Sequence, residues 1–362
     1  MNTYAVYFKP RGALASWPLA SDTLFGAVCW GVRMLGLMDD DQLTAWLESQ
    51  RESPLFAFSH AFPAYLKGGS PLRLYPRPAT FQSTFADFDA LALEWQKQKG
   101  GTLKTAKAKL AEAGKSFKRL GYVSEGTLAE IIAGRLKPVD GLQAMLFDTS
   151  AVTAKAGTLC TKSEAKQLPE KLFQSEAMQH NQIDRMAGAT VEGALYYRDE
   201  TFFAPGAGLW ALLRAEPADF EQYIHPALRY LADTGFGADR TSGKGHFEID
   251  VQPAPLLPQA ATPHGMMTLS HYLPIAGEFD PQAEPLAYAL KTLRPKREQK
   301  YPRLLPPGQK TPPVYKQAMR VFEPGSVFPL KIQKAVYGRL ARLTPPEQEA
   351  VYQSGAALML YL

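Results

Sequence analysis

Cysteine is scarce in the sequence, which has only Cys29 and Cys160 among its 362 residues. Two cysteines so far apart provide no disulfide framework, and they lack the paired spacing of a structural zinc site. Cys29 falls on the apolar face of a predicted helix, where a reduced thiol is expected. The sequence therefore excludes the class of small disulfide-stabilised secreted domains and predicts a protein without a metal or another cofactor.

Long apolar runs are also lacking. The longest one, residues 24–37, is interrupted by Arg33. A membrane-spanning helix needs about 20 consecutive apolar residues. The first residues contain no basic segment followed by an apolar one, which a secretion signal requires. We therefore expect a cytoplasmic protein with no membrane segment.

Charge of one sign is not in large excess, because 40 Lys and Arg residues face 35 Asp and Glu residues. The resulting net charge of +5 does not by itself indicate a nucleic-acid partner. The distribution is uneven, however. Residues 97–119 contain eight basic residues against the single acid Glu112, and residues 294–320 contain eight against Glu298. Such blocks usually form solvated faces, but two of them make an acidic partner worth testing.

A glycine-rich loop, residues 234–246, is the most distinctive stretch of the chain. It contains four glycines together with Arg240 and Lys244. The apolar spacing of residues 220–231 predicts a helix before it, with a kink or a new start at Pro226. Alternation over residues 247–251 predicts a strand after it. Because the order is helix, loop, strand, and because five residues separate Gly237 from Gly243, the loop is not the phosphate loop of an NTPase. Two interpretations remain open, namely a cradle for an extended anionic backbone and a simple connector.

The remaining pattern predicts an α+β fold. We expect a strand over residues 3–8, a helix capped by Ser21 or Asp22 and ending near Gly36, and a short helix over 39–50. Further expected segments are edge strands over 59–78, a helical insertion over 85–134, a mobile loop or hairpin tip over 149–168, a hairpin over 193–204 that turns at 198–200, and a strand over 208–214.

Two domains follow from this order. Residues 1–252 read as a β-α-β-β-α-β unit, which is a ferredoxin-like arrangement with insertions at about 80–190. After a proline-rich linker, residues 253–362 read as a smaller β-rich domain. It has strands near residues 266, 317–322, 326–330 and 351–362, and a short helix over 286–293.

Two polar groups are candidates for ligand contacts. His180, Asn181, Asp184 and Arg185 precede a predicted hairpin, where they serve either recognition or local turn chemistry. The helix start at residues 21–22 offers free N–H groups to an anion, although simple capping is the more ordinary explanation for Ser21 and Asp22 taken alone.

An ordered set of motifs covers nearly the whole chain. The set comprises S-D-T-L-F (21–25), A-F-P-A-Y (61–65), Y-P-R-P (75–78), Y-V-S-E-G-T-L-A-E-I-I-A-G (122–134), H-N-Q-I-D-R-M-A-G (180–188), the glycine-rich loop with the strand that follows it, E-P-G-S-V-F (323–328) and V-Y-Q-S-G-A-A-L (351–358). In these motifs the chain resembles the fourth subunit of the Csm complex, the type III-A CRISPR effector, a family of the RAMP superfamily.

The resemblance implies two ferredoxin-like (RAMP/RRM-like) domains that face each other across a groove. It also implies a subunit without catalytic activity that caps the repeat-derived five-prime handle of the guide RNA. The implied protein partners are the large polymerase-like, nuclease-bearing subunit and the first backbone RAMP subunit. A thumb-like hairpin against the guide–target duplex, and hence indirect contact with target RNA, is implied as well; residues 148–188 are the candidate segment.

The residues themselves suggest how single-stranded RNA would be held. Lys9, Arg185, Arg240 and Lys244 would meet phosphates, while His180 and Asn181 would read base edges or hydroxyls. The strands lack the pattern of an RRM, so recognition is expected from loops. The predicted RNA-binding residues are Lys9, Arg11, Ser21, Asp22, His180, Asn181, Arg185, Gly235, Gly237, Arg240, Thr241, Ser242, Gly243, Lys244, Gly245 and His246.

Two rival functions remain. A guide-processing endoribonuclease of the same superfamily would need a general base, and His246 beside Lys244 or His180 beside Arg185 could serve. A subunit that only bridges other proteins would not touch RNA.

Overall fold

A nine-stranded sheet lies at the centre of the computed structural model, which describes residues 1–15, 17–82, 85–147, 150–184, 186–191, 193–296, 315–345 and 348–362. The strand order is β13-β1-β12-β3-β4-β5-β7-β6, and β2 also pairs with β12. All neighbours are antiparallel except β5 and β7. The strands are β1 (Asn2–Pro10), β2 (Phe56–Phe58), β3 (Phe62–Tyr65), β4 (Leu72–Pro76), β5 (Tyr122–Ser124), β6 (Val152–Lys155), β7 (Thr158–Thr161), β12 (Ala207–Ala215) and β13 (Phe247–Pro253).

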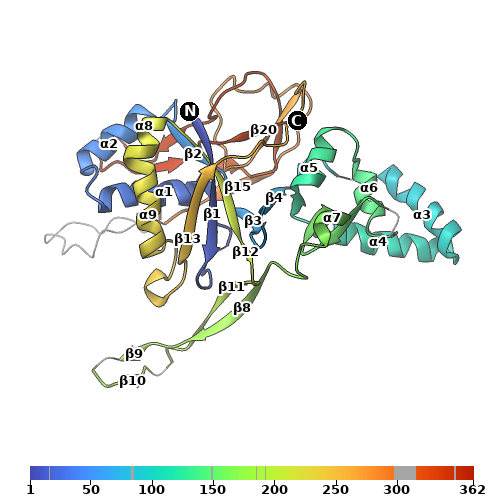
Figure 1. Ribbon diagram of the computed structural model, residues 1–362, viewed down its shortest axis with the longest axis horizontal. Coiled ribbons are helices and arrows are strands. Elements are labelled where there is room, and N and C mark those ends of the chain that lie inside the picture. Colours follow the sequence, from blue (N-terminus) through green and yellow to red (C-terminus); the bar gives the residue numbers. More distant parts are fainter. Residues whose placement is uncertain are drawn as a thin grey trace.

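Two helices pack against this sheet and against each other, α1 (Ser21–Met34) and α9 (His225–Thr234) (Figure 1). They cross closely at Gly31, where a Cβ atom would lie 3.0 Å from the Cβ of Ala227. Strands β13, β1, β12 and β3 are neighbours in the sheet, and in the chain α1 follows β1 while α9 lies between β12 and β13. The predicted helix before the glycine-rich loop consists of α8 (Pro217–Asp219), a π-helical turn (Phe220–Ile224) and α9. Pro226 lies in the first turn of α9, which confirms the predicted new start.

The start of α1 differs from the prediction. Ala20 is the N-cap residue, and no side chain caps the helix, so the capping roles predicted for Ser21 and Asp22 are wrong. Both side chains instead bond to the C-terminal half of the chain, because they face the seam between the two halves. The next helix, α2 (Asp40–Ser49), begins as predicted, with a capping box formed by Asp39 and Gln42.

The predicted helical insertion is present. It contains α3 (Phe85–Lys99), α4 (Leu103–Arg119) and α5 (Glu125–Ile132), followed by α6 (Pro138–Gln143) and α7 (Lys162–Ala165). One neighbouring prediction fails. Strands β3 and β4 are interior strands rather than edge strands, because β5 continues the sheet beyond them. Within the segment predicted as a mobile loop or a hairpin tip, residues 152–161 form the β6–β7 hairpin, with Leu159 and Cys160 fully buried, which confirms the second alternative.

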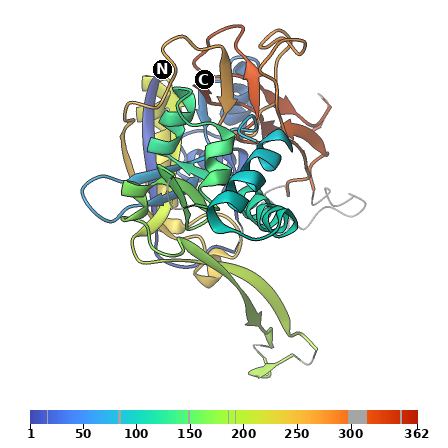
Figure 2. The same ribbon diagram turned by 90° about the vertical axis from the view of Figure 1, so that its right-hand side faces the viewer.

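A long hairpin projects from the body of the molecule (Figures 1 and 2). Its strands are β8 (Phe173–His180) and β11 (Tyr196–Phe203), and its tip carries β9 (Ile183–Asp184) and β10 (Ala189–Thr190). The turn predicted at residues 198–200 is wrong, because Arg198 lies opposite Met178 in the middle of the ribbon. The projecting hairpin starts within the predicted segment 148–188 but ends beyond it, and residues 148–149 lie outside the described residues.

The C-terminal half contains three small sheets. Strands β14 (Gly265–Thr268), β17 (Val327–Pro329) and β20 (Met359–Tyr361) form one of them, and the pairs β15 (Leu290–Leu293) with β16 (Met319–Phe322) and β18 (Leu340–Arg342) with β19 (Tyr352–Ser354) form the others. The helix predicted over 286–293 is wrong, because Leu290 pairs with Phe322 across β15 and β16. No described residue of this half is helical.

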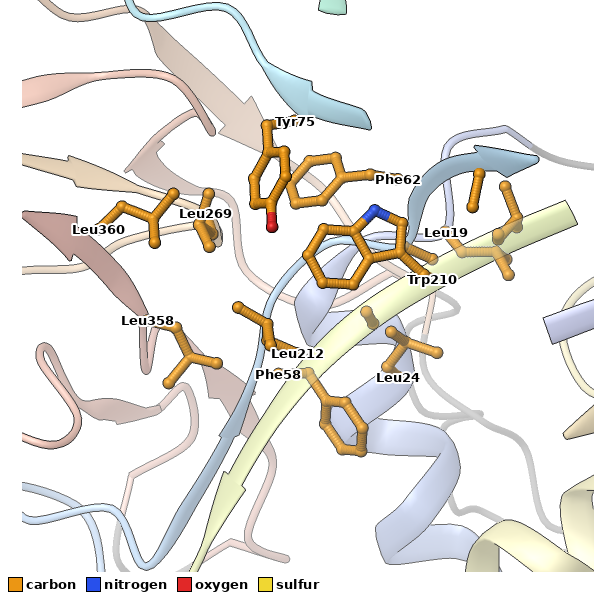
Figure 3. Close-up of a cluster of buried hydrophobic side chains, with 14 of the residues drawn as sticks. Leu19, Leu24, Phe58, Phe62, Tyr75, Trp210, Leu212, Leu269, Leu358 and Leu360 are labelled. Carbon is orange, nitrogen blue, oxygen red and sulfur yellow. The ribbon is translucent and has the colours of Figure 1, made fainter. Parts of the chain in front are cut away.

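One hydrophobic core joins the two halves (Figure 3). Trp210 on β12 is fully buried, and its indole Nε1 donates to the carbonyl oxygen of Leu74 at 2.9 Å. The ring of Tyr75 packs edge-on at 4.9 Å between centroids. Leu269, Leu358 and Leu360 of the C-terminal half complete the same core. The C-terminal sheets are therefore fixed to the N-terminal sheet by buried apolar contact.

Candidate nucleic-acid interface

The glycine-rich loop closes on itself through backbone hydrogen bonds. The N–H of Phe236 donates to the oxygen of Gly245 at 3.1 Å, and the N–H of Lys244 donates to the oxygen of Asp239 at 3.3 Å. Between them lies a single 3-10 turn (Arg240–Ser242). His246 Nε2 lies 3.1 Å from the oxygen of Arg240, which closes the loop from its far end. The loop is therefore a defined structure rather than an unstructured connector.

Gly245 is required by the loop's own fold. Its φ is 68°, and a Cβ atom there would lie 2.1 Å from the carbonyl oxygen of Phe236. Gly237 and Gly243 also have positive φ values of 89° and 84°, but no heavy atom lies within 4 Å of their Cβ positions. The close backbone contact at Gly245 fits the interpretation of the loop as a simple connector. At Gly237 and Gly243 the space around the backbone is open, which fits the interpretation of the loop as a cradle for an anionic backbone.

The segment that follows β1 packs under the loop. The N–H of Arg11 donates to the oxygen of His246 at 2.9 Å, and the N–H of Gly245 donates to the oxygen of Ala13 at 3.1 Å. Leu14 then exchanges two backbone hydrogen bonds with Thr201 on β11, at 2.9 and 2.8 Å. Three distant parts of the chain, namely residues 11–14, the base of the hairpin and the glycine-rich loop, are thereby held together.

Two ion pairs connect the hairpin to the loop. Lys244 donates to Glu200 on β11, and His180 on β8 lies 3.0 Å from the other carboxylate oxygen of Glu200. The Glu200 side chain is only 2% exposed, so its charge depends on these partners. On the outer side, Arg198 donates to Asp239 of the loop. The side chains of this hairpin strand therefore set the position of the loop.

An aromatic group lies beside these ion pairs. The rings of His180 and Tyr196 are stacked, with centroids 5.3 Å apart and planes 13° apart. The guanidinium of Arg198 lies 5.2 Å from the centroid of the Tyr196 ring. Tyr196 also lines a cavity of about 570 Å³ together with Asn181, Gln182 and Ile183. A planar ring and amide groups line this open cavity, and His180 and Arg198 contact the same ring, so the site can stack a base and bind its polar edge.

The structure brings part of the predicted set together. His180, Lys244 and His246 belong to the hairpin–loop contact, with Gly235 and the turn residues Arg240, Thr241 and Ser242 in the same loop. The backbone N–H of Arg11 connects this residue to the loop at His246, and Asn181 lines the cavity. Arg185 lies outside the described residues.

Lys9 lies on β1, where its Nζ is 2.7 Å from Glu248 on the neighbouring strand β13. The hydrogen bond with Glu248 raises the pKa of Lys9, and the same bond lowers the pKa of Glu248. Both side chains are about half exposed, so water weakens the pair.

Ser21 and Asp22 lie at the seam between the two halves and not in the hairpin–loop contact. Ser21 is buried, and the Asp22 side chain is 8% exposed. The N–H of His271 donates to Ser21 Oγ at 2.9 Å, and His271 Nδ1 lies 2.9 Å from Asp22 Oδ1. Burial raises the pKa of Asp22, but the hydrogen bond and charge of His271 outweigh it, so the pKa is lowered overall. These two residues join the halves.

Sequence reasoning missed Tyr196, Arg198, Glu200 and Asp239. The charged cluster at Arg198 and Glu200 is typical of a turn, although the same residues also alternate as they would along a strand. Had the stretch been read as a strand, Arg198, Glu200 and Phe202 would have shared one face, and the pairing of Glu200 with a cation would have been a reasonable expectation.

In the part of the chain that the structure describes, no group of three or more His, Cys, Asp or Glu side chains is placed to hold a metal ion. Cys29 and Cys160 are both buried thiols, and burial raises their pKa values to about 12 and about 11. No helix among the described residues has the length and apolar character needed to cross a membrane.

Comparison with known proteins gives partial sequence similarity. No family model matches the chain. The CRISPR system Cms protein Csm4 of Thermococcus onnurineus (strain NA1) is 33% identical over 92 residues, which are 25% of this chain and 30% of that protein. The chain therefore matches less than a third of the length of this curated relative.

Solved structures give similarity over the full length. A chain of the Csm3-Csm4 subcomplex in the type III-A CRISPR-Cas interference complex matches with a TM-score of 0.62 at 14% identity, covering 100% of this chain and 99% of that one. A chain of the Csm1-Csm4 cassette in complex with cA4 matches with a TM-score of 0.55 at 16% identity, covering 100% and 98%. The chain thus shares a segment of sequence with one Csm4 protein, and it shares its overall fold with chains of these two assemblies.

Proposed function

We propose that the protein is the RNA-binding subunit of a type III-A CRISPR effector that holds the repeat-derived five-prime handle of the guide RNA. The observation that carries this proposal is the hairpin–loop contact, in which buried Glu200 binds Lys244 and His180, and His180 stacks on Tyr196, a residue that lines an open cavity. A bent single strand needs stacking surfaces, polar groups for base edges and cations for phosphates, and all three occur there.

The contacts can be assigned by chemistry. Tyr196, with His180 and Arg198 against its ring, offers a stacking surface, and Asn181 offers an amide for a base edge or a 2′-hydroxyl. The exposed Arg11 lies beneath the loop and supplies a charge for phosphate. Lys244 has three N–H donors, of which Glu200 uses one, so it orders the loop and retains donors for RNA.

The proposed protein partners are taken from the assemblies in which the structurally similar proteins were solved. Those proteins were solved in a Csm1-Csm4 cassette and a Csm3-Csm4 subcomplex, which supports a role for this chain between a large subunit and a backbone subunit. The projecting hairpin (173–203) is the thumb-like element in this proposal, and it would meet target RNA paired with the guide. In this proposal residues 1–252 and residues 253–362 form two ferredoxin-like domains. The second domain contains little helix.

A binding titration tests the proposal. The full chain is titrated with labelled single-stranded RNA that begins with the repeat-derived handle, and with a scrambled RNA of equal length. The variant Arg11→Ala is expected to bind the handle more weakly, and its salt slope should fall by roughly 0.7 for each phosphate contact that is lost. Arg229→Ala, which removes an exposed arginine from α9, is the matched control and should bind as the unchanged protein does. Equal binding of the handle and the scrambled RNA would contradict the proposal.

A second candidate function rests on one observation. His180 lies 3.0 Å from the buried carboxylate of Glu200, an arrangement that can orient a general base in a metal-independent ribonuclease. Incubation with precursor guide RNA separates the two functions. Specific cleavage that is lost in His180→Ala or His246→Ala would establish the enzyme, whereas intact RNA that stays bound supports the non-catalytic role. RNA crosslinking that does not change in Arg11→Ala combined with Tyr196→Ala would favour a subunit that only bridges proteins.

A further inference from the structure

Helix α4 carries a row of lysines along one side. Lys104, Lys107, Lys115 and Lys118 are all exposed, and their spacing places them within an arc of about 80° around the helix axis. With a rise of about 1.5 Å per residue, the row is about 21 Å long. Lys97 and Lys99 at the end of α3, together with Arg119, add further exposed charge nearby.

The buried side of the helix holds this row in place. Leu110 and Phe117 are each 1% exposed, and a Cβ atom at Gly114 would lie 2.7 Å from the ring of Phe88 on α3. The guanidinium of Arg77 lies 5.0 Å from the centroid of the Phe117 ring and donates to the carbonyl oxygen of Phe117 at 3.0 Å. The lysines therefore project from a fixed backbone, and a ligand would have only their side chains to order.

Among the described residues, most of this charge has no close acidic partner. Lys107 pairs with Asp89 at 3.1 Å, but both side chains are more than half exposed, so the pair is weak. For Lys104, Lys115 and Lys118 no ion pair occurs among the described residues. In Figures 1 and 2 the α3–α4 pair lies at a different end of the molecule from the projecting hairpin. This basic face is thus separate from the candidate interface described above.

We propose that the α4 lysine row binds the phosphate backbone of an RNA duplex without reading its sequence. The row is complementary in charge to phosphate, and its length suits a straight, rigid polyanion. Phe117 is the single aromatic residue of α4 and is buried, so the face has no stacking surface of the kind that holds single strands. The choice of RNA over DNA rests on the proposed function, in which guide and target RNA form the duplex at hand.

The test is a titration of the full chain with a labelled, blunt RNA duplex of about 20 base pairs at several salt concentrations. The variant carries Lys104→Gln, Lys115→Gln and Lys118→Gln, which keep good helix formers at exposed positions. We expect at least a tenfold loss of affinity at low salt and a fall in the salt slope of about 2.7, three times the roughly 0.9 per phosphate contact. The same three positions changed to arginine should keep both values.

A charge-matched control carries Lys67→Gln, Lys166→Gln and Lys331→Gln, three exposed lysines outside the row, and should bind the duplex normally. An unchanged affinity of the row variant, an equal loss in the control, or tighter binding of a matched DNA duplex would overturn the proposal. Handle RNA is titrated in parallel, and the row variant should bind it normally. Failure of the unchanged protein to bind handle RNA would count against the proposed function and not against the lysine row.

Discussion

Glu200 is the residue on which the candidate interface depends. It is buried, it lies on the projecting hairpin, and it contacts Lys244 of the loop and His180 of the paired strand. A buried carboxylate is stable only while such partners compensate its charge. Lys244 therefore has a structural task in addition to any contact with RNA.

Replacement of Lys244 by methionine is expected to destabilise the protein. It leaves the Glu200 carboxylate buried with His180 as its remaining partner, which should lower the free energy of unfolding by about 3 kcal/mol, as for other broken buried pairs. Urea unfolding measures the change. Glu200→Gln in the same chain should restore part of the loss, because no buried charge remains. Additive effects of the two substitutions would contradict the pairing of Lys244 with Glu200.

His60 makes the seam between the two halves sensitive to acid. It is buried, its Nδ1 accepts from the N–H of Ser21 at 3.2 Å, and its ring packs edge-on against His271 at 4.4 Å. Burial lowers the pKa of His60 well below its usual value, and the nearby charge of His271 lowers it further. The folded protein therefore keeps His60 neutral at a pH where the unfolded chain is protonated.

Stability should consequently fall as the pH drops below about 6.5, the pKa of His60 in the unfolded chain. In this range the unfolded state binds a proton that the folded state does not, so the free energy of unfolding decreases by up to about 1.4 kcal/mol per pH unit. The lowered pKa of Asp22 adds a further loss below about pH 4. His60→Asn, which keeps an acceptor for Ser21, should flatten the curve between about pH 6.5 and 5. An equally steep curve in this variant would show that His60 is not the responsible group.

The two ends of the projecting hairpin contribute differently to the stability of the fold. At its base, Phe173 and Phe203 pack on Trp17, with ring centroids 4.9 and 6.4 Å from that side chain. At its tip, Ile183 and Met186 are 60% and 97% exposed. The base is thus attached by apolar packing, whereas the tip offers its apolar side chains to a partner.

Substitutions at the two ends should differ in effect. Phe173→Ala is expected to lower the free energy of unfolding by about 1–3 kcal/mol, because it removes packing from Trp17. Ile183→Ser with Met186→Ser should change it by no more than about 0.5 kcal/mol, because these side chains bury little surface. Thermal unfolding of both variants gives the comparison. A large loss from the tip variant would mean that the tip contributes to the folded core.

The elements that the sequence pattern predicted well are those with one buried face. Residues 220–231 show helical spacing, and they form a π-helical turn (Phe220–Ile224) followed by α9, which has Pro226 in its first turn. The failures share a different cause. Most of the β8–β11 ribbon meets water on both faces, with Glu200 and Thr201 as buried exceptions, so its charged residues resemble those of a turn. The short segment 286–293 fits either a helix or a strand until its partner β16 is known. Pairing with strands that are distant in the sequence determines whether such a segment becomes a strand. The local residue pattern carries no information about that pairing.

At the candidate interface, too, the local sequence pattern predicts single segments but not the contacts between them. Glycines and cations marked the loop at residues 234–246, and His180 and Asn181 marked the hairpin. Their connection through Glu200 depends on the fold, as does the burial of Ser21 and Asp22 at the seam.

Across the whole molecule, the two halves share one core and should unfold together. Leu269 of the C-terminal half is fully buried against the N-terminal core that contains Trp210. Leu269→Ala should lower the free energy of unfolding by about 2–5 kcal/mol. Calorimetry should then show one transition that moves to lower temperature as a whole. Leu256→Ala, at an 89% exposed position between the halves, is the control and should change little. Two separate transitions, of which only one moves, would contradict the shared core.

We propose above that this chain holds the five-prime handle of a guide RNA at the contact between the hairpin and the glycine-rich loop. The most direct test is ultraviolet crosslinking of the purified effector complex, followed by identification of the joined peptides and nucleotides. The account predicts crosslinks from Tyr196 and from residues 239–246 to one common five-prime segment shared by the bound RNAs. Crosslinks from these residues only to nucleotides outside that segment, or bound RNAs with no common five-prime segment, would contradict it.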